Sequence, residues 1–272
     1  MSMIDLLRNR VYYISMFDTH AHLTDEKFDA DRDEMYARFL ECPNPTAVVI
    51  GCDMAEIDNA ITFARMHDEL YYAIGVHPSY VDKFDEKEFL KKVDTSDPKL
   101  VAIGEIGLDY YEGNPDKELQ IKAFDTQIKI AKRLGLPFCV HCRDAYGDCL
   151  KVLKANAPYP NGGIMHCYSG SAEWAREVMQ MGFYISFSGN VTFKNASRLR
   201  EVAKTIPLDK ILVETDCPYL APEGKRGSRN EPANVQLVID CLAKLHNISY
   251  EEMLRISDEN GIRAYKILSK NK

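Results

Sequence analysis

The sequence lacks several features that would place it in familiar classes of protein. It has no apolar run long enough to span a membrane and no visible secretory signal. Eight cysteines in 272 residues are too few for a disulfide-based scaffold. The 34 basic and 41 acidic residues give a formal net charge of −7, which argues against a surface that binds nucleic acid over its whole extent. We therefore expect a protein of the reducing cytoplasm with no membrane association.

The composition is that of a globular chain, with 46% hydrophobic and 28% charged residues. Its length fits either two small domains or one large α/β barrel, so the spacing of the elements has to decide. Residues 1–15 precede a second methionine, Met16, at which a strand-like segment begins abruptly. We interpret 1–15 as an N-terminal extension, with an upstream start codon as one explanation, and 16–272 as the folded domain.

Short apolar or β-branched runs alternate with amphipathic stretches, which is typical of successive βα units. The predicted strands are 16–21, 47–52, 71–76, 100–105, 137–142, 163–167, 183–187 and 211–215. The predicted helices are 29–41, 54–67, 85–93, 117–134, 144–156, 171–181, 195–205, 232–245 and 249–268. Eight parallel strands favour a single α/β domain, a (β/α)₈ TIM barrel. The alternative, an open doubly wound sheet, would normally have a Gly-rich turn after its first strand, where this chain has His20-Ala21-His22.

Five of the seven histidines lie at or just past the C-terminal end of a predicted strand. They are His20, His22, His77, His141 and His166. In a barrel, active sites are assembled at this end. His20 and His22 are two residues apart, so strand alternation places both rings on one face. A single strand-end histidine is more often a hydrogen-bonded core residue, and it is the convergence of several that indicates a metal site.

Two further strand ends supply carboxylates, Glu105 and Asp216. A buried carboxylate is costly unless a positive charge compensates it, and a metal ion does so directly. Four histidines and two carboxylates exceed what one tetrahedral ion needs, so we predict two divalent ions bridged by Glu105. The donor types do not distinguish Zn²⁺, Mn²⁺, Mg²⁺, Fe²⁺ and Ni²⁺.

Other residues near the strand ends are candidates to position the histidine ligands or to contact the substrate. Asp18 and Glu214 share strand parity with His20 and Asp216, so each is either a partner for a histidine ring N–H or a carboxylate satisfied by water. His77 is either a seventh ligand or a substrate contact, and we favour the contact.

Basic and aromatic residues after the strands are candidates for substrate binding. Arg143, two residues past His141, is placed to clamp a phosphate. A loop after the last strand carries Lys225, Arg226 and Arg229, which form either a positive rim or an ordinary solvated loop. Tyr168, Tyr110 and Tyr111 are candidates to stack against a base.

The segments FDTHAHL, AIGVHP, IGEIGLDYY, VHCRDA, HCYSG, ETDCPYLAP and RNEPANV resemble the signatures of the TatD family of metal-dependent hydrolases, over about 16–268. The resemblance implies one metal held by His20, His22 and Asp216, a second held by His141 and His166, and Glu105 between them. It also implies a deoxyribonuclease that removes nucleotides from DNA ends. The stretch 224–230 departs slightly from the family pattern, which leaves the substrate preference open.

These residues predict hydrolysis by a water that two metals activate, with Asp216 accepting its proton and Glu105 bridging the ions. The expected partner is a nucleic-acid end or a small phosphodiester, and we expect no obligate protein partner. A carbonyl hydrolase that cleaves esters or amides, including an aminoacyl ester of tRNA, would use the same site. A third alternative is a scaffold that binds metal without turnover.

Overall fold

The computed structural model describes residues 15–111, 113 and 115–267. The expected N-terminal extension, apart from Ser15, lies outside the described residues. Within them, eight parallel strands pair in the order of the sequence. They are β1 (Met16–Ala21), β2 (Pro45–Gly51), β3 (Leu70–Ile74), β4 (Leu100–Asp109), β5 (Phe138–Arg143), β6 (Gly163–Met165), β7 (Phe183–Phe187) and β8 (Ile211–Val213).

The ring of strands closes where the chain leaves β8 and meets β1. The Asp216 N–H donates to the His20 carbonyl at 3.0 Å, and the His22 N–H donates to the Cys217 carbonyl at 2.8 Å. Strands of this order with a helix after each form a nearly closed barrel, so the predicted (β/α)₈ fold in one domain is confirmed.

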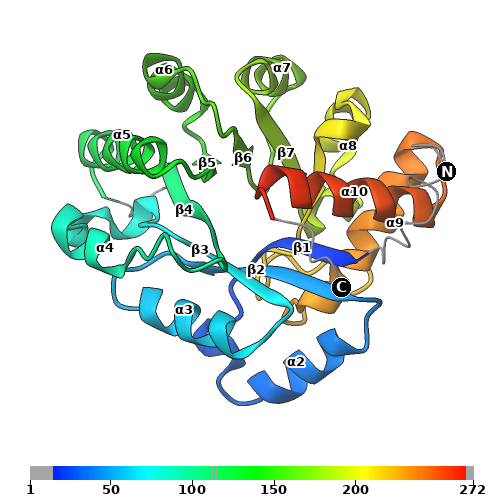
Figure 1. The fold of residues 1–272 in the computed structure, drawn as a ribbon. Coiled ribbons are helices and arrows are strands. Elements are labelled where there is room, and N and C mark those ends of the chain that lie inside the picture. The colour runs from blue at the N-terminus through cyan, green and yellow to red at the C-terminus, as the bar shows by residue number, and fades with distance from the viewer. Residues whose placement is uncertain (1–14, 112, 114, 268–272) are drawn as a thin grey trace, which may run out of the picture.

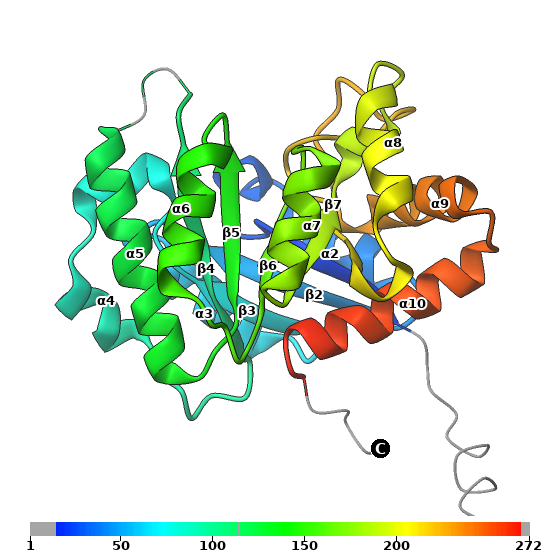
Figure 2. The ribbon, with the colours of Figure 1, turned by 90° about the horizontal axis from the view of Figure 1, so that it is seen from above.

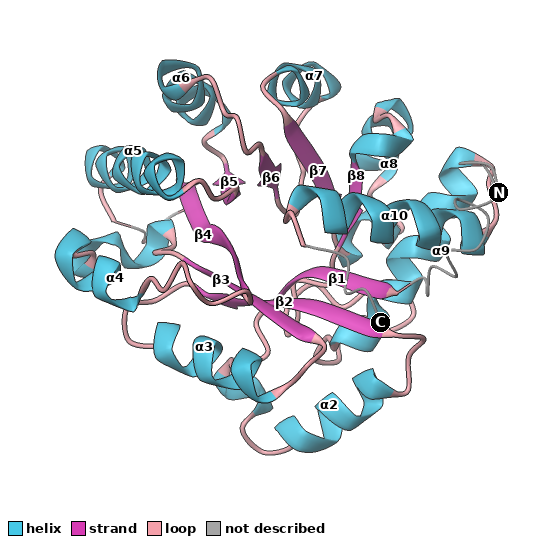
Figure 3. Cartoon of the chain, viewed as in Figure 1, coloured by secondary structure: helices cyan, strands magenta, loops and turns pink. Residues whose placement is uncertain are grey.

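Helices surround the strands on the outside (Figures 1 and 3). They are α2 (Arg32–Leu40), α3 (Ile57–Met66), α4 (Glu86–Lys92), α5 (Lys117–Leu134), α6 (Tyr146–Asn156), α7 (Ala172–Gln180), α8 (Ser197–Thr205), α9 (Val235–His246) and α10 (Tyr250–Ala264). Short 3₁₀ turns lie at η1 (Glu26–Phe28), η2 (Pro78–Lys83), η3 (Gly189–Thr192), η4 (Leu208–Lys210) and η5 (Pro232–Asn234). No helix in the described part of the chain is both long and apolar enough to cross a membrane.

The predicted elements match the observed ones closely, with differences at strand ends that bear on the site. Strands β3 and β8 end at Ile74 and Val213, each two residues before its predicted end. Helix α5 has the predicted bounds because Gly135 ends it with φ 71°, a left-handed conformation that suits glycine. Strand β4 continues four residues past its predicted end, as far as Asp109. Strand β6 ends at Met165, so His166 lies on the loop after the strand.

The apolar core has two parts. A large cluster lies between the strands and the helices, and a small one inside the barrel includes Phe17 and Tyr265. The Tyr265 hydroxyl donates to the Thr19 carbonyl at 2.7 Å, and Gly261 of α10 packs so tightly on Phe17 that an added Cβ would lie 2.5 Å from its ring. Helix α10 therefore covers the end of the barrel at which the strands begin, opposite the β5 arrowhead (Figure 2).

Candidate metal centre

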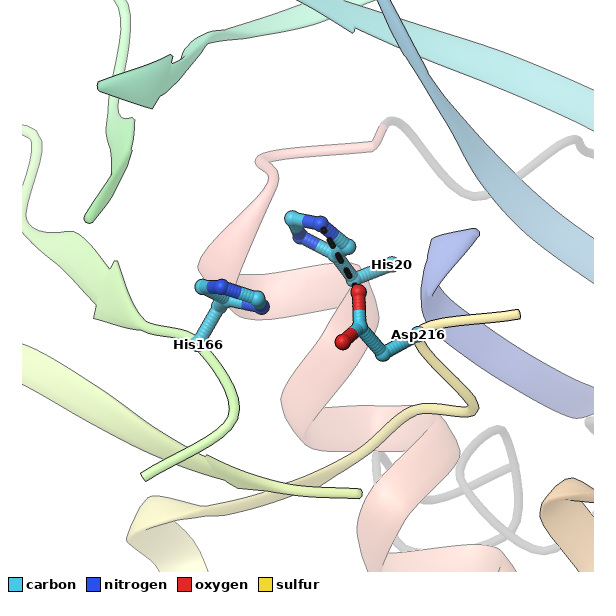
Figure 4. Close-up of side chains that lie close together, drawn as sticks. All are labelled: His20, His166 and Asp216. Atoms are coloured by element: carbon cyan, nitrogen blue, oxygen red, sulfur yellow. Dashed lines mark ion pairs between the residues drawn. The ribbon is translucent and has the colours of Figure 1, made fainter. Parts of the chain in front are cut away.

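The first group of candidate ligands comes from β1 and the residue that follows it, from β4 and from the loop after β8. The Nε2 atoms of His20 and His22 lie 3.3 Å apart, as expected for two residues on one face of a strand. Both approach Asp216 Oδ1, at 3.8 and 3.4 Å, and Glu105 Oε2, at 3.3 and 3.7 Å. Figure 4 shows the Asp216 carboxylate beside the His20 ring, with His166 close by.

The second group comes from β5 and from the loop after β6. His141 Nδ1 and His166 Nε2 lie 3.2 Å apart, and each is 2.8 Å from Glu105 Oε1. Glu105 therefore directs one carboxylate oxygen at His141 and His166 and the other at His20 and His22. The two groups are in direct contact, because the His20 and His166 rings stack with centroids 4.0 Å apart.

Local backbone features bring these side chains together. Asp216 has φ 56°, a left-handed conformation that costs energy in a residue with a side chain and occurs mainly where the surroundings enforce it. On β4, Gly107 has φ 146°, and a Cβ there would lie 2.0 Å from the His141 carbonyl oxygen. A side chain at position 107 would therefore push β4 away from β5 next to His141.

His77 lies beside the second group. Its Nε2 is 3.7 Å from Glu105 Oε1, its ring centroid is 4.4 Å from that of His141, and its Nδ1 accepts a hydrogen bond from the Ser79 N–H at 3.1 Å. Burial, together with the charge of His141, lowers its pKa to about 3. His77 is therefore neutral at pH 7, a form that suits either a ligand or a substrate contact.

Two carboxylates hold the rings of the second group. Glu214 Oε1 lies 3.1 Å from His166 Nδ1 and also accepts the Cys167 N–H at 2.8 Å, so of the two alternatives for Glu214 the ring partner is the observed one. Asp109 Oδ2 lies 3.0 Å from His141 Nε2. The predicted strand 100–105 ended too early to include Asp109, although strand alternation from Glu105 through Gly107 places Asp109 on the same face.

Asp18 has a different role from the expected one. Its carboxylate accepts hydrogen bonds from the Thr215 N–H at 2.9 Å, the Thr215 hydroxyl at 2.5 Å and the His20 N–H at 3.3 Å. It thereby ties β1 to the segment after β8. The Nδ1 of His20 instead faces Cys139 Sγ, at 3.4 Å. The pairing of β1 with β2 is irregular between Asp18 and Ala21, so simple alternation does not hold there.

The pKa shifts of the candidate ligands suit the binding of cations. Burial opposes ionisation of Glu105, but neighbouring His166 and His77 hold its pKa well below the usual range. Burial likewise opposes ionisation of Asp216, and the contact with His22 lowers its pKa. Burial disfavours protonation of His141, yet contacts with Asp109 and Glu105 raise its pKa to about 9. The carboxylates are therefore charged, and a metal would take the place of the histidine protons.

A cavity of about 750 Å³ opens over these residues. Its lining includes all of the candidate ligands except His20, which lies beneath it, together with His77 and Arg143. Further lining residues that the sequence analysis did not single out are Asp25, Glu56, Asp109, Asn190 and Tyr219. The exposed Arg143 guanidinium lies 4.0 Å above the Tyr111 ring. Several carboxylates thus face this cavity, with one arginine at its edge.

Two of the expected substrate-binding residues do not line this cavity. Tyr168 is only 2% exposed, and its hydroxyl donates to the Ser171 carbonyl at 2.6 Å, so its ring is not available to a base. Arg229 forms a bidentate ion pair with Asp31, at 2.5 and 2.7 Å, and a further bond to Glu231 at 3.0 Å. The positive charge of Arg229 is thus paired with carboxylates of the protein itself. We therefore no longer assign Tyr168 or Arg229 to substrate binding.

Other candidates for substrate contact are likewise held by neighbours. The Tyr110 hydroxyl donates to Asp148 at 2.9 Å, and Arg226 lies 3.8 Å above the Phe193 ring. In the loop after β8, Lys225 and Arg226 remain exposed, whereas Arg229 is paired with Asp31 and Glu231.

Comparison with known proteins identifies the family. Residues 17–266 match the family model described as TatD related DNase. The chain belongs to the TatD family. It is 44% identical to YabD of Bacillus subtilis, a metal-dependent hydrolase, over 93% of this chain and 99% of that protein.

Other TatD relatives cover nearly the whole chain as well. The protein named 3′-5′ ssDNA/RNA exonuclease TatD, of Cronobacter turicensis, is 32% identical over 92% of this chain and 97% of its own length. The crystal structure of the TatD homologue YjjV of Escherichia coli superposes with a TM-score of 0.85, at 28% identity, covering 93% of this chain and 98% of that one. The protein is therefore a TatD-type metal-dependent hydrolase.

Proposed function

We propose that this TatD protein binds two divalent cations and hydrolyses phosphodiester bonds at the ends of nucleic-acid strands. The observation that carries the proposal is the position of Glu105, whose two oxygens face two separate groups of ligands. A carboxylate with this arrangement suits a bridge between two ions. On this proposal His20, His22 and Asp216 hold one cation, and His141 and His166 hold the other.

The donor set fits the proposed cations. Imidazole nitrogens and carboxylate oxygens suit Zn²⁺, Mn²⁺, Fe²⁺ and Ni²⁺, and the carboxylates also suit Mg²⁺. The buried charges of Glu105 and Asp216 need positive compensation, which the neighbouring histidines provide only when they are protonated. When bound, such cations would supply an acidified water and stabilise negative charge on the attacked phosphate.

Residues of the chain perform the remaining steps in this proposal. The Asp216 carboxylate takes a proton from the attacking water and passes it to the leaving oxygen. Arg143 lies at the cavity edge, where its guanidinium binds a phosphate oxygen of the substrate. The Asp109 and Glu214 carboxylates keep the His141 and His166 rings in their orientations.

The choice of a phosphodiester rests on charge and on the relatives. Asp25, Glu56 and Asp109 face the cavity, so a phosphate would be repelled unless cations were present. Arg143 adds a positive group at the edge. The Cronobacter relative is named as an exonuclease on single-stranded DNA and RNA, which favours the same substrate class here. The candidate metal centre lies within a cavity, which the end of a nucleic-acid strand can enter more easily than the interior of a duplex.

A substrate comparison tests the proposal. Protein stripped of metal and reloaded with Mn²⁺ or Zn²⁺ is given end-labelled single-stranded DNA, a simple aryl phosphodiester, a carboxylic ester and an aminoacyl ester. We expect stepwise shortening of the DNA that depends on metal. Cleavage of the esters alone would replace the proposal with carbonyl hydrolysis, and turnover of none of them would support a metal-binding scaffold. Metal analysis that finds one equivalent after reloading would refute the two-cation site.

We also propose a reducing compartment, the cytoplasm, as the place of action. All eight cysteines are free thiols. Cys52, Cys142 and Cys167 line the cavity of the metal centre, where oxidation would add bulk and polarity. Cys167 lies at a left-handed turn, φ 43°, next to His166.

A further inference from the structure

A second cavity of about 530 Å³ lies outside the metal centre, beside α6, α7 and the loop before α8. Its size is in the range of small-molecule sites, about 300–1,000 Å³. Its lining includes Tyr146 of α6, Trp174 of α7, Arg198 of α8, and Ser169 and Gly170 between β6 and α7. None of them is used in the hydrolytic site proposed above.

The two cavities share a wall. Ser169 lines both of them and lies three residues after the candidate ligand His166. The Ser169 N–H donates to the Tyr146 hydroxyl at 3.2 Å, and the two hydroxyls are 2.9 Å apart. Tyr146 belongs to the second cavity, so this pair of residues joins the two spaces. The second cavity therefore borders the cavity of the metal centre.

The walls of the second cavity present aromatic surface. The Tyr146 and Trp174 rings meet edge to face with centroids 5.5 Å apart, and both are partly exposed. Beneath them, Gly170 leaves room that a side chain would fill, because an added Cβ would lie 2.6 Å from the Tyr168 hydroxyl oxygen and 2.7 Å from the Tyr146 ring. The buried Tyr168, whose centroid is 6.0 Å from that of Tyr146, thus supports the wall.

A positive charge lies at the same opening. Arg198, near the start of α8, is exposed and forms no salt bridge with any residue in the described ranges 15–111, 113 and 115–267. Arg229, by contrast, is paired with Asp31. Aromatic rings with an arginine are the combination by which proteins bind the bases and backbone of single-stranded nucleic acid.

We propose that this second cavity binds a nucleotide of a single-stranded chain whose end lies at the metal centre. A base packs against Tyr146 and Trp174, and Arg198 binds a neighbouring phosphate. This inference rests on the proposed nuclease function and extends it, because it makes the substrate an oligonucleotide rather than a mononucleotide-sized phosphodiester. It also predicts that strand length, beyond the reacting end, contributes to affinity.

Trp174 is the only tryptophan of the chain, so its fluorescence reports on this cavity directly. Full-length Asp216→Asn protein, and wild-type protein held in chelator, are titrated with ten-nucleotide oligothymidylate and with the dinucleotide. We expect saturable quenching by the ten-nucleotide strand and little by the dinucleotide. An unchanged spectrum at strand concentrations that saturate binding in a polarisation assay would overturn the proposal.

Variants give a second measurement, with Arg133→Ala on the exposed face of α5 as the matched control. Trp174→Ala and Arg198→Ala should each weaken binding of a labelled ten-nucleotide strand by about five-fold or more, since stacking on one aromatic ring is worth at least that factor. They should raise KM for the long strand relative to the dinucleotide, whereas Arg133→Ala leaves that ratio unchanged.

The outcomes separate this inference from the function on which it rests. If DNA is hydrolysed but the length dependence and the Trp174 signal are absent, the second cavity is not a nucleotide site and the proposed function stands. If no nucleic acid is hydrolysed under any metal, the proposed function fails. If a peptide or another protein quenches Trp174 where oligothymidylate does not, the cavity has a different partner and the inference is refuted.

Discussion

Asp109 Oδ2 lies 3.0 Å from His141 Nε2, on the side of the ring away from Glu105. This contact holds the ring so that Nδ1 faces the metal centre. It also makes Asp109 the partner that, with Glu105, keeps the pKa of His141 raised, to about 9, against the opposing effect of burial. A carboxylate in this position makes an imidazole a stronger ligand.

Replacing Asp109 should therefore weaken metal binding. Asp109→Asn keeps the size of the side chain but removes the charge, and we expect metal affinity to fall by about 10–100-fold. Calorimetric titration of metal-free protein measures this. Asp94→Asn, an exposed carboxylate on the loop after α4, is the matched control. Equal affinities of the Asp109→Asn and wild-type proteins would show that the contact has no such role.

The stability of the metal-free protein and the gain in stability on adding metal should change with pH in opposite directions. In metal-free protein the pKa of His141 is raised from 6.5 to about 9, with burial opposing and the bonds to Asp109 and Glu105 prevailing. Burial also raises the pKa of Asp18 to about 8. The folded state therefore holds both protons more tightly than the unfolded state. The stabilisation from His141 is lost as the pH rises from 6.5 through 9, and that from Asp18 is lost as the pH rises from 3.8 through 8.

A metal needs the neutral imidazole, so its binding strengthens over the same interval. The Tm of chelated protein should thus fall between pH 6.5 and 9, while the gain in Tm on adding Mn²⁺ or Zn²⁺ should grow. Thermal unfolding at several pH values with and without chelator checks both trends. A metal-induced gain that shrinks toward pH 9 would contradict the assignment of these histidines.

Asp216→Asn should abolish most of the metal-dependent hydrolysis. The amide cannot accept the proton of the attacking water, so we expect kcat to fall by at least about 100-fold. Circular dichroism and Tm should stay close to wild type because the residue is replaced by one of equal size. Full activity of a folded Asp216→Asn protein would remove Asp216 from the mechanism.

Arg143→Ala should weaken binding of phosphodiesters. Loss of a charge-assisted hydrogen bond raises KM by about ten-fold or more. Arg133→Ala, which removes an exposed arginine of α5, is the matched control. If KM for a phosphodiester is the same in Arg143→Ala and wild type, the case for a carbonyl substrate becomes stronger.

Arg229→Ala should affect stability rather than substrate binding. Its guanidinium joins Asp31 to Glu231 and lies 4.5 Å above the Phe28 ring. We expect Tm to fall by about 2–4 °C, the shift of an ordinary destabilising substitution in a domain of this size. A raised KM for DNA with an unchanged Tm would restore Arg229 to the substrate-binding residues.

Much of the site could be predicted because its chemistry follows the strand ends. His20 and His22 lie together, as their two-residue spacing predicted. His166 and Asp216 follow the ends of β6 and β8, His141 lies near the end of β5, and Glu105 lies inside β4, four residues before its end, so a closed barrel brings them to one mouth. The prediction for Asp18 failed where the pairing of β1 with β2 becomes irregular. Alternation alone does not survive such an irregularity.

The sequence by itself determined the repeating βα units, their order and the six residues that converge at the mouth, because each depends on local periodicity and on position along the chain. Only the tertiary structure decided the partners: Asp109 beside His141, Tyr168 inside the wall and Arg229 held by Asp31. These contacts join segments whose distance depends on strand register and loop packing. Strand register and loop packing are not encoded in a local sequence pattern, so these contacts cannot be predicted without the three-dimensional structure.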